Sequence, residues 1–376
     1  MESMVTSSVR FQNNFSDKKV LITGNTGFKG SWLTAWLLKL GANVYGISKD
    51  IPTQPSLFET LKLKSQINHT FLDIRNLDGL SKELETINPD FVFHLAAQPI
   101  VSQSYDNPLE TITTNVVGTA NVLESLRKIN HKCVAVIITS DKCYENLEWV
   151  WGYKETDRLG GKDMYSASKG AAEIIYHSYY RAFFDQKKEN LFTATARAGN
   201  VIGGGDWARD RIVPDCIRAW SENEQVTIRQ PLATRPWQHV LEPLSGYLQL
   251  ASRLWESKSL NGESFNFGPS PESNATVKQL ISDLGIKWGI SNEKDLFRVI
   301  GEVAFSEAGL LKLNCDKALA HLQWRPTLTY DELVDFTGNW YKAFHEDRLD
   351  MQNFTTQQID QFEKIAAKRN IKWAIK

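Results

Sequence analysis

The sequence has few cysteines and no long apolar run among its 376 residues. The four cysteines stand at positions 133, 143, 216 and 315, which gives neither a C-x-x-C pair nor any other zinc-ligand spacing. We therefore expect reduced thiols, a cytoplasmic location and no bound metal. No apolar stretch is long enough to cross a bilayer, so a membrane protein is not expected either.

The chain also lacks an excess of charge of one sign. Its 43 basic and 44 acidic residues give a formal net charge of −1, which argues against a nucleic-acid-binding protein. Residues 1–19 have no apolar segment typical of a signal peptide, and we expect the first sixteen or so to form a loose arm. The 42% of hydrophobic residues is enough for a sizeable globular core.

Short apolar strands alternate with helical patterns through the first half of the chain. We expect strands at 18–23, 43–48, 69–73, 89–97 and 133–140, with helices between them at 31–41, 77–88 and 107–129. This alternation predicts an α/β fold with a doubly wound, parallel Rossmann sheet and right-handed crossovers. Beyond residue 200 we expect helices at 213–223, 275–289 and 329–347, and a late strand within 262–270 that returns to the sheet.

A glycine-rich turn, "GNTGFKG", lies between the first strand and the first helix. Its G-x-x-G-x-x-G spacing lets the backbone approach a pyrophosphate, which binds at the N-terminus of the helix. A tight turn without a ligand is the alternative, but the position in the first βα unit favours a dinucleotide site. The residues expected to bind the cofactor here are Gly24, Asn25, Thr26, Gly27, Phe28, Lys29 and Gly30.

Charged residues at the ends of the next strands bear on the choice of dinucleotide. Asp73 ends the third expected strand, where its carboxylate can accept a hydrogen bond from an adenine amino group, although a helix cap or turn is an equally ordinary role. At the end of the second strand, Asp50 would favour NAD and Lys49 would favour NADP. The residues alone leave this choice open.

Tyr165 and Lys169 are four residues apart in a helical segment and therefore share one face. A tyrosine has an ordinary pKa of about 10, and a nearby ammonium lowers it towards the range of a useful base. A solvated pair on a helix surface is the common alternative for Tyr-x-x-x-Lys. The glycine-rich turn upstream favours the catalytic interpretation.

These motifs together resemble the extended short-chain dehydrogenase/reductase superfamily (the NAD-dependent epimerase/dehydratase family) over almost the whole chain. The resemblance implies NAD as cofactor, and Ser140, 25 residues before Tyr165, as a hydrogen-bond partner of the substrate's 4-hydroxyl. Further cofactor-binding positions that it implies are Asp73, Ile74, Leu95, Ala96, Ala97, Asn115, Tyr165 and Lys169.

An acid stands directly beside a base in "IITSDKCYEN", at the end of the fifth expected strand. In this superfamily, nucleotide-sugar 4,6-dehydratases carry an Asp-Glu pair here and 4-epimerases do not, whereas this chain has Asp141-Lys142. The segments "TSDKCYEN", "EWVWGY", "RAGNVIGGGDWARDRIVPD", "GFKGSWL" and "TRPWQHV" resemble the dehydratases that act on CDP-glucose. One departure is Asn25, where many relatives have histidine.

The resemblance implies an internal redox dehydration within deoxysugar biosynthesis, as in O-antigen synthesis. Tyr165 would take the proton of the 4-hydroxyl while hydride moves from C4 to NAD, and elimination of water across C5 and C6 would follow. We expect Asp141 as the acid and Lys142 as the base, active as a neutral Asp-COOH and Lys-NH2 pair. A charged Lys142 that stabilises the enolate is the alternative.

Substrate recognition is expected mainly in the second half of the chain. The candidate residues are Gln98, Asn200, Arg209, Arg211, Arg235, Trp237 and His239, and the arginines offer forked donors to a diphosphate. The expected domains are 17–200 with a returning segment near 240–268 for NAD, 201–239 with 269–350 for the nucleotide sugar, and a helical tail at 351–376. A homodimer through the long helices after the fourth and fifth strands is implied by the resemblance.

Two rival functions remain open from the sequence. A nucleotide-sugar 4-epimerase, or a 4,6-dehydratase of another nucleotide, would have the same fold. A dinucleotide-sensing regulator without catalysis is the other rival, although such a protein would not need both Tyr165 and Lys169.

Overall fold

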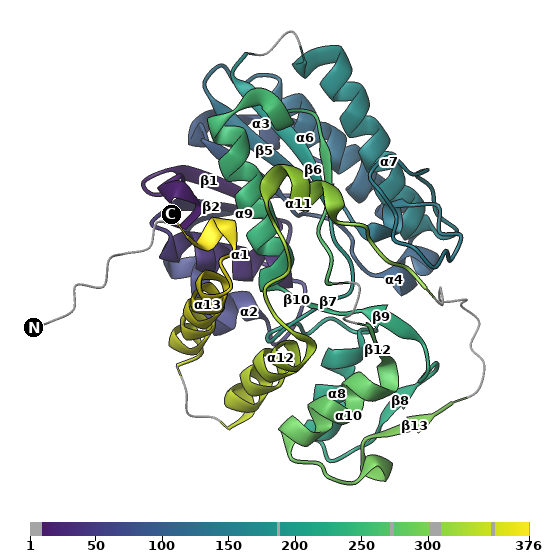
Figure 1. Ribbon diagram of the computed structural model, residues 1–376. Helices are drawn as coiled ribbons and strands as arrows, with labels where there is room; N and C mark the ends of the chain where they lie inside the picture. The colour runs from purple at the N-terminus through teal and green to yellow at the C-terminus, as the bar shows by residue number, and fades with distance from the viewer. Residues whose placement is uncertain (1–9, 186–188, 271–273, 301–309, 347–349, 376) are drawn as a thin grey trace, which may run out of the picture.

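The computed structural model describes residues 10–185, 189–270, 274–300, 310–346 and 350–375 (Figure 1). Its centre is a seven-stranded sheet in the order β11-β6-β5-β4-β1-β2-β3, in which all neighbouring strands are parallel. The strands are β1 (Lys19–Thr23), β2 (Asn43–Ser48), β3 (Asn68–Phe71), β4 (Phe91–His94), β5 (Cys133–Ile138), β6 (Leu191–Arg197) and β11 (Ser264–Asn266). The expected doubly wound sheet is confirmed, and the late strand joins it beside β6.

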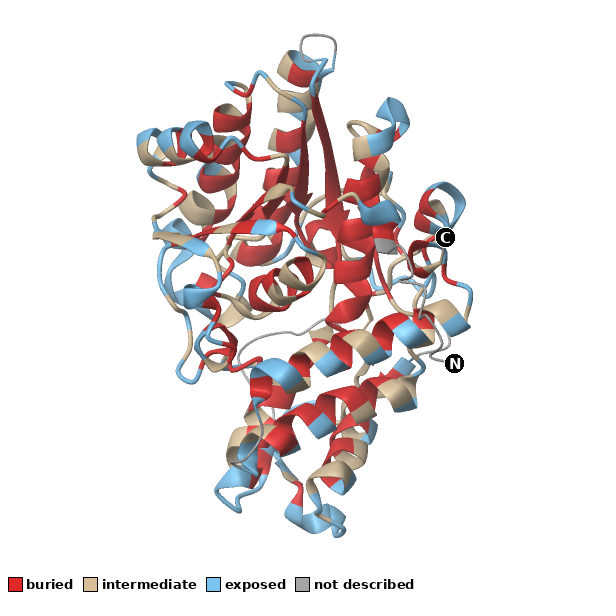
Figure 2. Ribbon diagram, turned by 90° about the vertical axis from the view of Figure 1, so that its left-hand side faces the viewer, coloured by how far each residue is buried: buried red, intermediate tan, exposed pale blue. Residues whose placement is uncertain are grey.

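Helices cover both faces of this sheet. The strand β1 shows why, because Val20 and Ile22 point into one apolar core while Leu21 points into the other. The first core contains α1 (Phe28–Lys39) and α9 (Leu241–Glu256). The second contains α3 (Leu77–Ile87), α6 (Gly118–Leu126) and α7 (Met164–Tyr179). Figure 2 shows the strands buried between these layers.

The second half of the chain adds a smaller lobe below the sheet in Figure 1. Its helices are α8 (Ile212–Ser221), α10 (Val277–Trp288) and α12 (Tyr330–His345). Its short strands pair as β7 (Val201–Ile202) with β10 (Gln238–His239), β8 (Val226–Ile228) with β13 (Phe297–Val299), and β9 (Thr234–Pro236) with β12 (Asn274–Thr276). The remaining α-helices are α2 (Leu57–Thr60), α4 (Val101–Asp106), α5 (Pro108–Ile112), α11 (Asp316–Leu322) and α13 (Met351–Lys368). None of the described helices is long and apolar enough to span a membrane.

The expectation of a loose N-terminal arm was wrong from residue 10 onwards. Phe11 and Phe15 are buried, and the Phe11 ring stacks on Trp373 with 4.9 Å between ring centroids. Two aromatic side chains therefore fix this segment in the first core, while residues 1–9 lie outside the described part of the chain. The C-terminal helix α13 packs on the same region, where Trp36 donates to Glu363 over 2.9 Å.

Strand β6 was not anticipated from the sequence. Its residues alternate between apolar and polar, yet all seven are buried. Thr193, Thr195 and Arg197 are buried because each finds a hydrogen-bond partner on α7. The third strand was also placed too long, since β3 ends at Phe71 and not at Asp73.

Candidate active site

The glycine-rich turn lies at the carboxyl end of β1 and leads into α1. Gly24 has a left-handed φ of +77°, and a Cβ there would lie 2.7 Å from the backbone nitrogen of Ala96. A Cβ on Gly30 would lie 2.2 Å from the Gly24 carbonyl oxygen. Gly27 is the N-cap of α1 and no side chain caps the helix, so the first backbone N–H groups are available to an anion. This turn fits a dinucleotide pyrophosphate.

Asn25, where many relatives have histidine, is wholly buried beneath the turn. Its amide oxygen accepts from Ser48 Oγ over 2.8 Å, and its amide nitrogen lies 3.2 Å from His69 Nδ1. Gly46 on β2 makes the room, because a Cβ there would lie 2.3 Å from the Asn25 amide nitrogen. Asn25 therefore braces the turn against β2 and β3.

The charged residues beyond β2 and β3 are engaged within the protein. Asp73 accepts from the backbone N–H of Arg75 over 2.9 Å and pairs with its guanidinium at 2.6 Å, which lowers the pKa of the carboxyl. Lys49 pairs with Glu110 at 3.1 Å. Thr26 Oγ1 donates to the Asp50 carbonyl over 2.7 Å. Asp73 and Lys49 are thus held by ion pairs, whereas Asp50 is held through its backbone carbonyl and not through its carboxylate.

Asn115 ties the loop after β4 to the helix that carries Tyr165. It accepts from the Gln98 backbone N–H over 2.8 Å and donates to Ser168 Oγ over 2.9 Å. It sits in a π-helical turn, Thr113–Val117, an irregularity that is frequent at functional sites. Gln98 itself donates to Thr111 over 2.8 Å, so its side chain is used in this loop.

The other residues expected around the cofactor lie beside this loop. Leu95, Ala96 and Ala97 are partly buried where β4 ends, and Ala96 is the close neighbour of Gly24 noted above. Ile74 is buried and packs against Gly118, where a Cβ would meet its side chain at 2.5 Å. Most of the expected cofactor residues thus lie at the ends of β1, β3 and β4. The others are Asn115 in the π-helical turn, and Tyr165 and Lys169 on α7.

Tyr165 and Lys169 lie one turn apart near the start of α7 and are 8% and 7% exposed. Burial raises the pKa of Tyr165 to about 12, although a hydrogen bond with the Ser140 side chain opposes the rise. Burial lowers the pKa of Lys169 to about 8. The pair is therefore a buried site and not a solvated one, and Ser140 belongs to it.

The acid and the base that follow β5 face different surroundings. Asp141 is 4% exposed, accepts from Ser140 Oγ over 2.9 Å, and rests on Gly199, where a Cβ would lie 1.8 Å from its Oδ2 atom. Lys142 is partly exposed, and its ammonium has no partner among the described residues. Asp141 is thus fixed beside Tyr165, while Lys142 remains free to reach a ligand.

Two further cations lie near this acid. Lys29, in the first turn of α1, interacts electrostatically with Arg211, Asp141 and Lys169, and its burial lowers its pKa to about 8. Arg211 is held by Asp206, with Nη1 and Oδ2 2.8 Å apart. The sequence assigned Lys29 only to the cofactor turn and did not identify Asp206.

The remaining candidate substrate residues are less closely grouped. Asn200 has a left-handed φ of 48° at the start of the loop after β6, Arg209 is exposed, and Arg235 lies partly buried on β9. Trp237 is 6% exposed and donates to the Ala275 carbonyl over 3.1 Å. These positions stay predictions.

His239 departs most from its expected place at the nucleotide site. It is 0% exposed and packs between Trp32 and Phe336, because β10 pairs with β7 inside the protein. Burial lowers the pKa of His239 to about 3, so it is neutral at ordinary pH. A side chain without exposed surface has no access to a ligand in this structure.

Three buried residues near the site were missed in the sequence. Glu173 and Arg197 form an ion pair at 2.9 Å, and the position of Glu173, one turn beyond Lys169 on the same helical face, was the signal for it. The Tyr247 hydroxyl on α9 is buried and has no hydrogen-bond partner among the described residues. Burial, and then Asp141, raises the pKa of Tyr247, so this hydroxyl lies within electrostatic reach of the acid.

Comparison with known proteins shows which family the chain resembles. The family model for GDP-mannose 4,6 dehydratase matches residues 21–337. The chain is 44% identical over 336 residues to a CDP-glucose 4,6-dehydratase from Salmonella typhimurium, covering 89% of this chain and 93% of that protein.

Solved structures share the fold. A UDP-glucuronic acid 4-epimerase from Bacillus cereus, in complex with UDP-glucuronic acid and NAD, has a TM-score of 0.73 and 26% identity over 87% of this chain and 99% of its own. A dTDP-glucose 4,6-dehydratase from Streptomyces venezuelae has a TM-score of 0.74 at 20% identity, over 89% and 99% of the two chains. The extent of the family match and the identity to the Salmonella enzyme together place this chain in the GDP-mannose 4,6-dehydratase family.

Proposed function

We propose that the protein converts CDP-D-glucose to CDP-4-dehydro-6-deoxy-D-glucose, as an NAD-dependent hydro-lyase. The observation that carries this proposal is the meeting of two pairs at the carboxyl edge of the sheet. Tyr165 and Lys169 are suited to oxidation, and Asp141 and Lys142 to elimination. The 44% identity to a CDP-glucose 4,6-dehydratase supports the nucleotide.

The glycine-rich turn and the ends of β3 and β4 would hold NAD, with Lys169 at its nicotinamide ribose. When bound, NAD takes a hydride from C4 of the sugar and later returns it to C6. The turn favours this ligand because its close backbone contacts and its uncapped helix N-terminus suit a pyrophosphate. Asp73 is the candidate partner of the adenine, provided that it leaves part of its contact with Arg75.

Tyr165 is the proposed base for the 4-hydroxyl proton. Its pKa of about 12 in the protein alone is too high for this role at neutral pH, so positive charge on the bound cofactor must lower it. Ser140 contacts Tyr165 and is placed to orient the same hydroxyl. These residues perform the oxidation.

Asp141 and Lys142 are the proposed acid and base of the elimination. Asp141 would protonate the departing 6-hydroxyl, and Lys142 would remove the C5 proton that the 4-keto group makes acidic. The neutral pair expected from the sequence needs a direct proton transfer between these two side chains, and the described residues show no hydrogen bond or ion pair between them. The unpaired ammonium of Lys142 supports a role towards ligand and not towards Asp141.

Arg211 is the proposed contact to the diphosphate, since Asp206 orients it towards the catalytic tyrosine. Asn200 and Arg235 are proposed for the diphosphate and the nucleotide, and Gln98 and Arg209 remain candidates for substrate contact. This assignment places substrate binding in 201–239 and 269–350, and cofactor binding in 17–200 with the segment near 240–268. Residues 351–376 form the proposed tail.

We also propose a cytoplasmic homodimer. Support comes from large apolar side chains that stay exposed on the long helices after β4 and β5: Leu109 is 74% exposed, Val117 46% and Ile174 55%. These side chains would be covered if the helices packed against a second copy of the chain. Sedimentation equilibrium should give twice the chain mass, and Ile174→Glu should give the monomer. A monomeric wild-type protein would refute this.

Turnover in D2O tests the proposed activity. The purified protein is incubated with NAD and CDP-glucose, with UDP-, GDP- and dTDP-glucose in parallel, and the product is read by NMR. We expect a 4-keto-6-deoxy sugar with deuterium at C5 from CDP-glucose. The same product from another nucleotide would refute the cytidine preference, a galactose product would indicate a 4-epimerase, and bound dinucleotide without turnover would favour a regulator.

A further inference from the structure

A fully buried ion pair lies directly beneath the active site and takes no part in the proposed chemistry. Arg197, the last residue of β6, contacts Glu173 of α7 through two parallel bonds, Nε to Oε1 and Nη2 to Oε2, each 2.9 Å long. The side chains are 1% and 0% exposed. Burying such a pair is unfavourable unless its remaining donors and acceptors are satisfied, and their partners indicate what the pair does.

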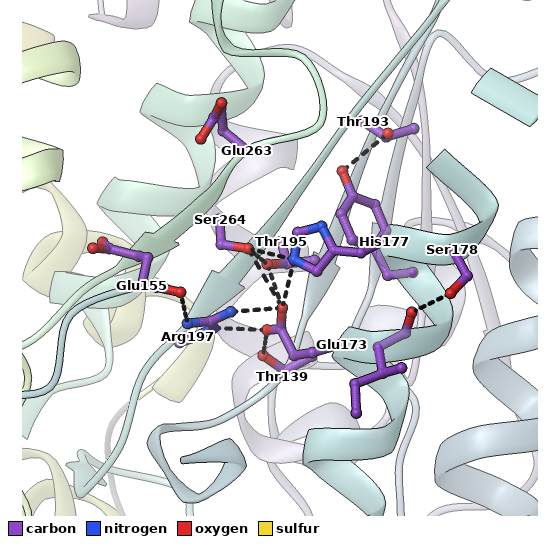
Figure 3. A network of polar contacts seen from close by, with 12 residues as sticks. Thr139, Glu155, Glu173, His177, Ser178, Thr193, Thr195, Arg197, Glu263 and Ser264 are labelled. Carbon is purple, nitrogen blue, oxygen red and sulfur yellow. Dashed lines mark hydrogen bonds and ion pairs between the residues drawn. The ribbon is translucent and has the colours of Figure 1, made fainter. Parts of the chain in front are cut away.

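The Glu173 carboxylate accepts hydrogen bonds from the hydroxyls of three residues, one just after β5, one on β6 and one on β11 (Figure 3). Thr139 donates to Oε1 over 2.5 Å, Thr195 donates to Oε2 over 2.9 Å, and Ser264 is a more distant donor at 3.5 Å. Burial alone would raise the pKa of Glu173, but Arg197 and these donors outweigh it and hold the pKa below its ordinary value. The carboxylate is therefore a fixed anion. Thr139 immediately precedes the segment that carries Ser140, Asp141 and Lys142.

The Arg197 guanidinium holds the other end of the same segment. Its Nη1 atom donates to the Tyr144 hydroxyl over 2.7 Å and to the Glu155 carbonyl over 3.1 Å. The guanidinium also lies over the Tyr144 ring, 4.9 Å from its centroid. The Tyr144 hydroxyl itself donates a hydrogen bond to Asn266 Oδ1 over 2.8 Å. Tyr144 comes two residues after Lys142.

We infer that Glu173 and Arg197 are positioning residues that clamp both ends of the acid–base segment, residues 140–143, against the helix of Tyr165 and Lys169. This inference rests on the proposed function for the roles of those residues. One end is held by Thr139 on Glu173, and the other by Tyr144 on Arg197. Tyr165, Lys169 and Glu173 follow one another at four-residue intervals on α7, so the clamp fixes the elimination pair relative to the oxidation pair.

Two mild variants test the clamp without breaking the buried ion pair. Thr139→Val and Tyr144→Phe each remove one hydroxyl and keep the shape of the side chain. The matched control is Tyr176→Phe, which removes a buried hydroxyl bonded to Thr193 across the same helix and strand, 3.1 Å apart, and does not touch the segment. Thr139→Val and Tyr176→Phe each lose one buried hydrogen bond, so a merely structural effect should be alike in these two. Tyr144→Phe loses two, one from Arg197 and one to Asn266.

Rapid mixing with CDP-glucose separates the two chemical steps. Reduction of the cofactor, followed at 340 nm, reports C4 oxidation, and loss of the C5 proton reports elimination. We expect both clamp variants to slow elimination about tenfold or more relative to oxidation, because small misplacements of an acid–base pair are expensive. Tyr176→Phe should leave this ratio unchanged. Equal slowing of both steps, or the same change in the control, would overturn the inference.

Backbone hydrogen exchange gives a second readout that does not depend on turnover. Amides of residues 139–146 should exchange roughly tenfold faster in the two clamp variants than in the wild type, and not in Tyr176→Phe. Unchanged exchange there would overturn the clamp. If the wild type shows no turnover on CDP-glucose, the proposed function fails, while exchange still decides whether the clamp exists.

Discussion

Two sets of charges, each buried or partly buried, lie near the active site and differ in their partners. Glu173 and Arg197 satisfy each other and bind neighbouring hydroxyls and carbonyls. Lys29 and Lys169 are close to Asp141 or Tyr165, but their ammonium groups have no hydrogen bond among the described residues, and burial lowers the pKa of each to about 8.

We interpret the first set as structural and the second as functional. A charge whose partners are all supplied by the protein stays fixed, whereas one that lacks them can respond to a ligand or a proton. Strongly shifted groups beside an acid and a tyrosine are typical of functional sites. The following predictions test this contrast, beginning with the largest expected effect.

Removal of the catalytic hydroxyl should have the largest effect. Tyr165→Phe should slow C4 oxidation roughly a thousandfold, because it removes the proposed base for the 4-hydroxyl proton. The measurement is cofactor reduction in a single turnover. The control is Tyr179→Phe on the same helix, whose hydroxyl donates to Glu124 over 3.3 Å. Oxidation at the wild-type rate in Tyr165→Phe would refute its role as base.

Breaking the ion pair between Glu173 and Arg197 should have the second largest effect. Arg197→Met leaves the Glu173 charge buried and unpaired, and should lower the free energy of unfolding by about 3–5 kcal/mol. Glu173→Met combined with Arg197→Met should lower it by less, since no lone charge remains. Urea unfolding at pH 7 measures both. A double variant as unstable as the single one would show that the charge is not what matters.

Removing Lys169 should stabilise the fold, whereas removing Arg197 should destabilise it, and the effect of Lys169 should depend on pH. In the folded protein Lys169 has a pKa of about 8, against the ordinary 10.5 of the unfolded chain. Below pH 8 it is charged in both states, and its burial destabilises the fold by about 3 kcal/mol. Between pH 8 and 10.5 the folded state loses its proton first, so this destabilisation disappears.

Lys169→Met should therefore be more stable than the wild type at pH 7, by up to about 3 kcal/mol. The advantage should shrink as pH rises towards 10, which urea unfolding at the two pH values will reveal. A constant difference would mean that Lys169 does not titrate in this range.

An exposed pair should matter least. Lys278 and Glu293 are 2.6 Å apart, with side chains 44% and 54% exposed. Lys278→Met should change the free energy of unfolding by less than about 1 kcal/mol, because solvent screens the attraction. If Lys278→Met lowered the free energy of unfolding as much as Arg197→Met, burial could not explain why the two ion pairs differ.

The sequence was most informative where structure is local. The glycine-rich turn, the βα alternation and the four-residue spacing of Tyr165 and Lys169 each depend on neighbouring residues, and the structure confirms the sheet that they predicted. Strand β6 was not predicted because its threonines and Arg197 are polar, and the sequence alone suggests that they are exposed to solvent. Only the fold brings Glu173 to them.

The substrate side could not be predicted as well, since it is built from irregular segments. His239 was chosen for its residue type, yet the pairing of short strands β7 and β10 places it in the interior. Phe11 and Phe15 were assigned to an arm because their surroundings are polar, and their contacts with Trp373 and Phe91 come from distant parts of the chain. Long-range packing of this kind leaves no periodic signal.

The central claim is that Tyr165 and Lys169 serve the oxidation while Asp141 and Lys142 serve the elimination. The variant Lys142→Met tests this claim most directly. The variant is mixed with CDP-glucose and NAD in D2O, and cofactor reduction and deuterium at C5 are followed together. We predict that C4 oxidation continues while deuterium no longer enters C5. Deuterium exchange at the wild-type rate would contradict the assignment of Lys142 as the base.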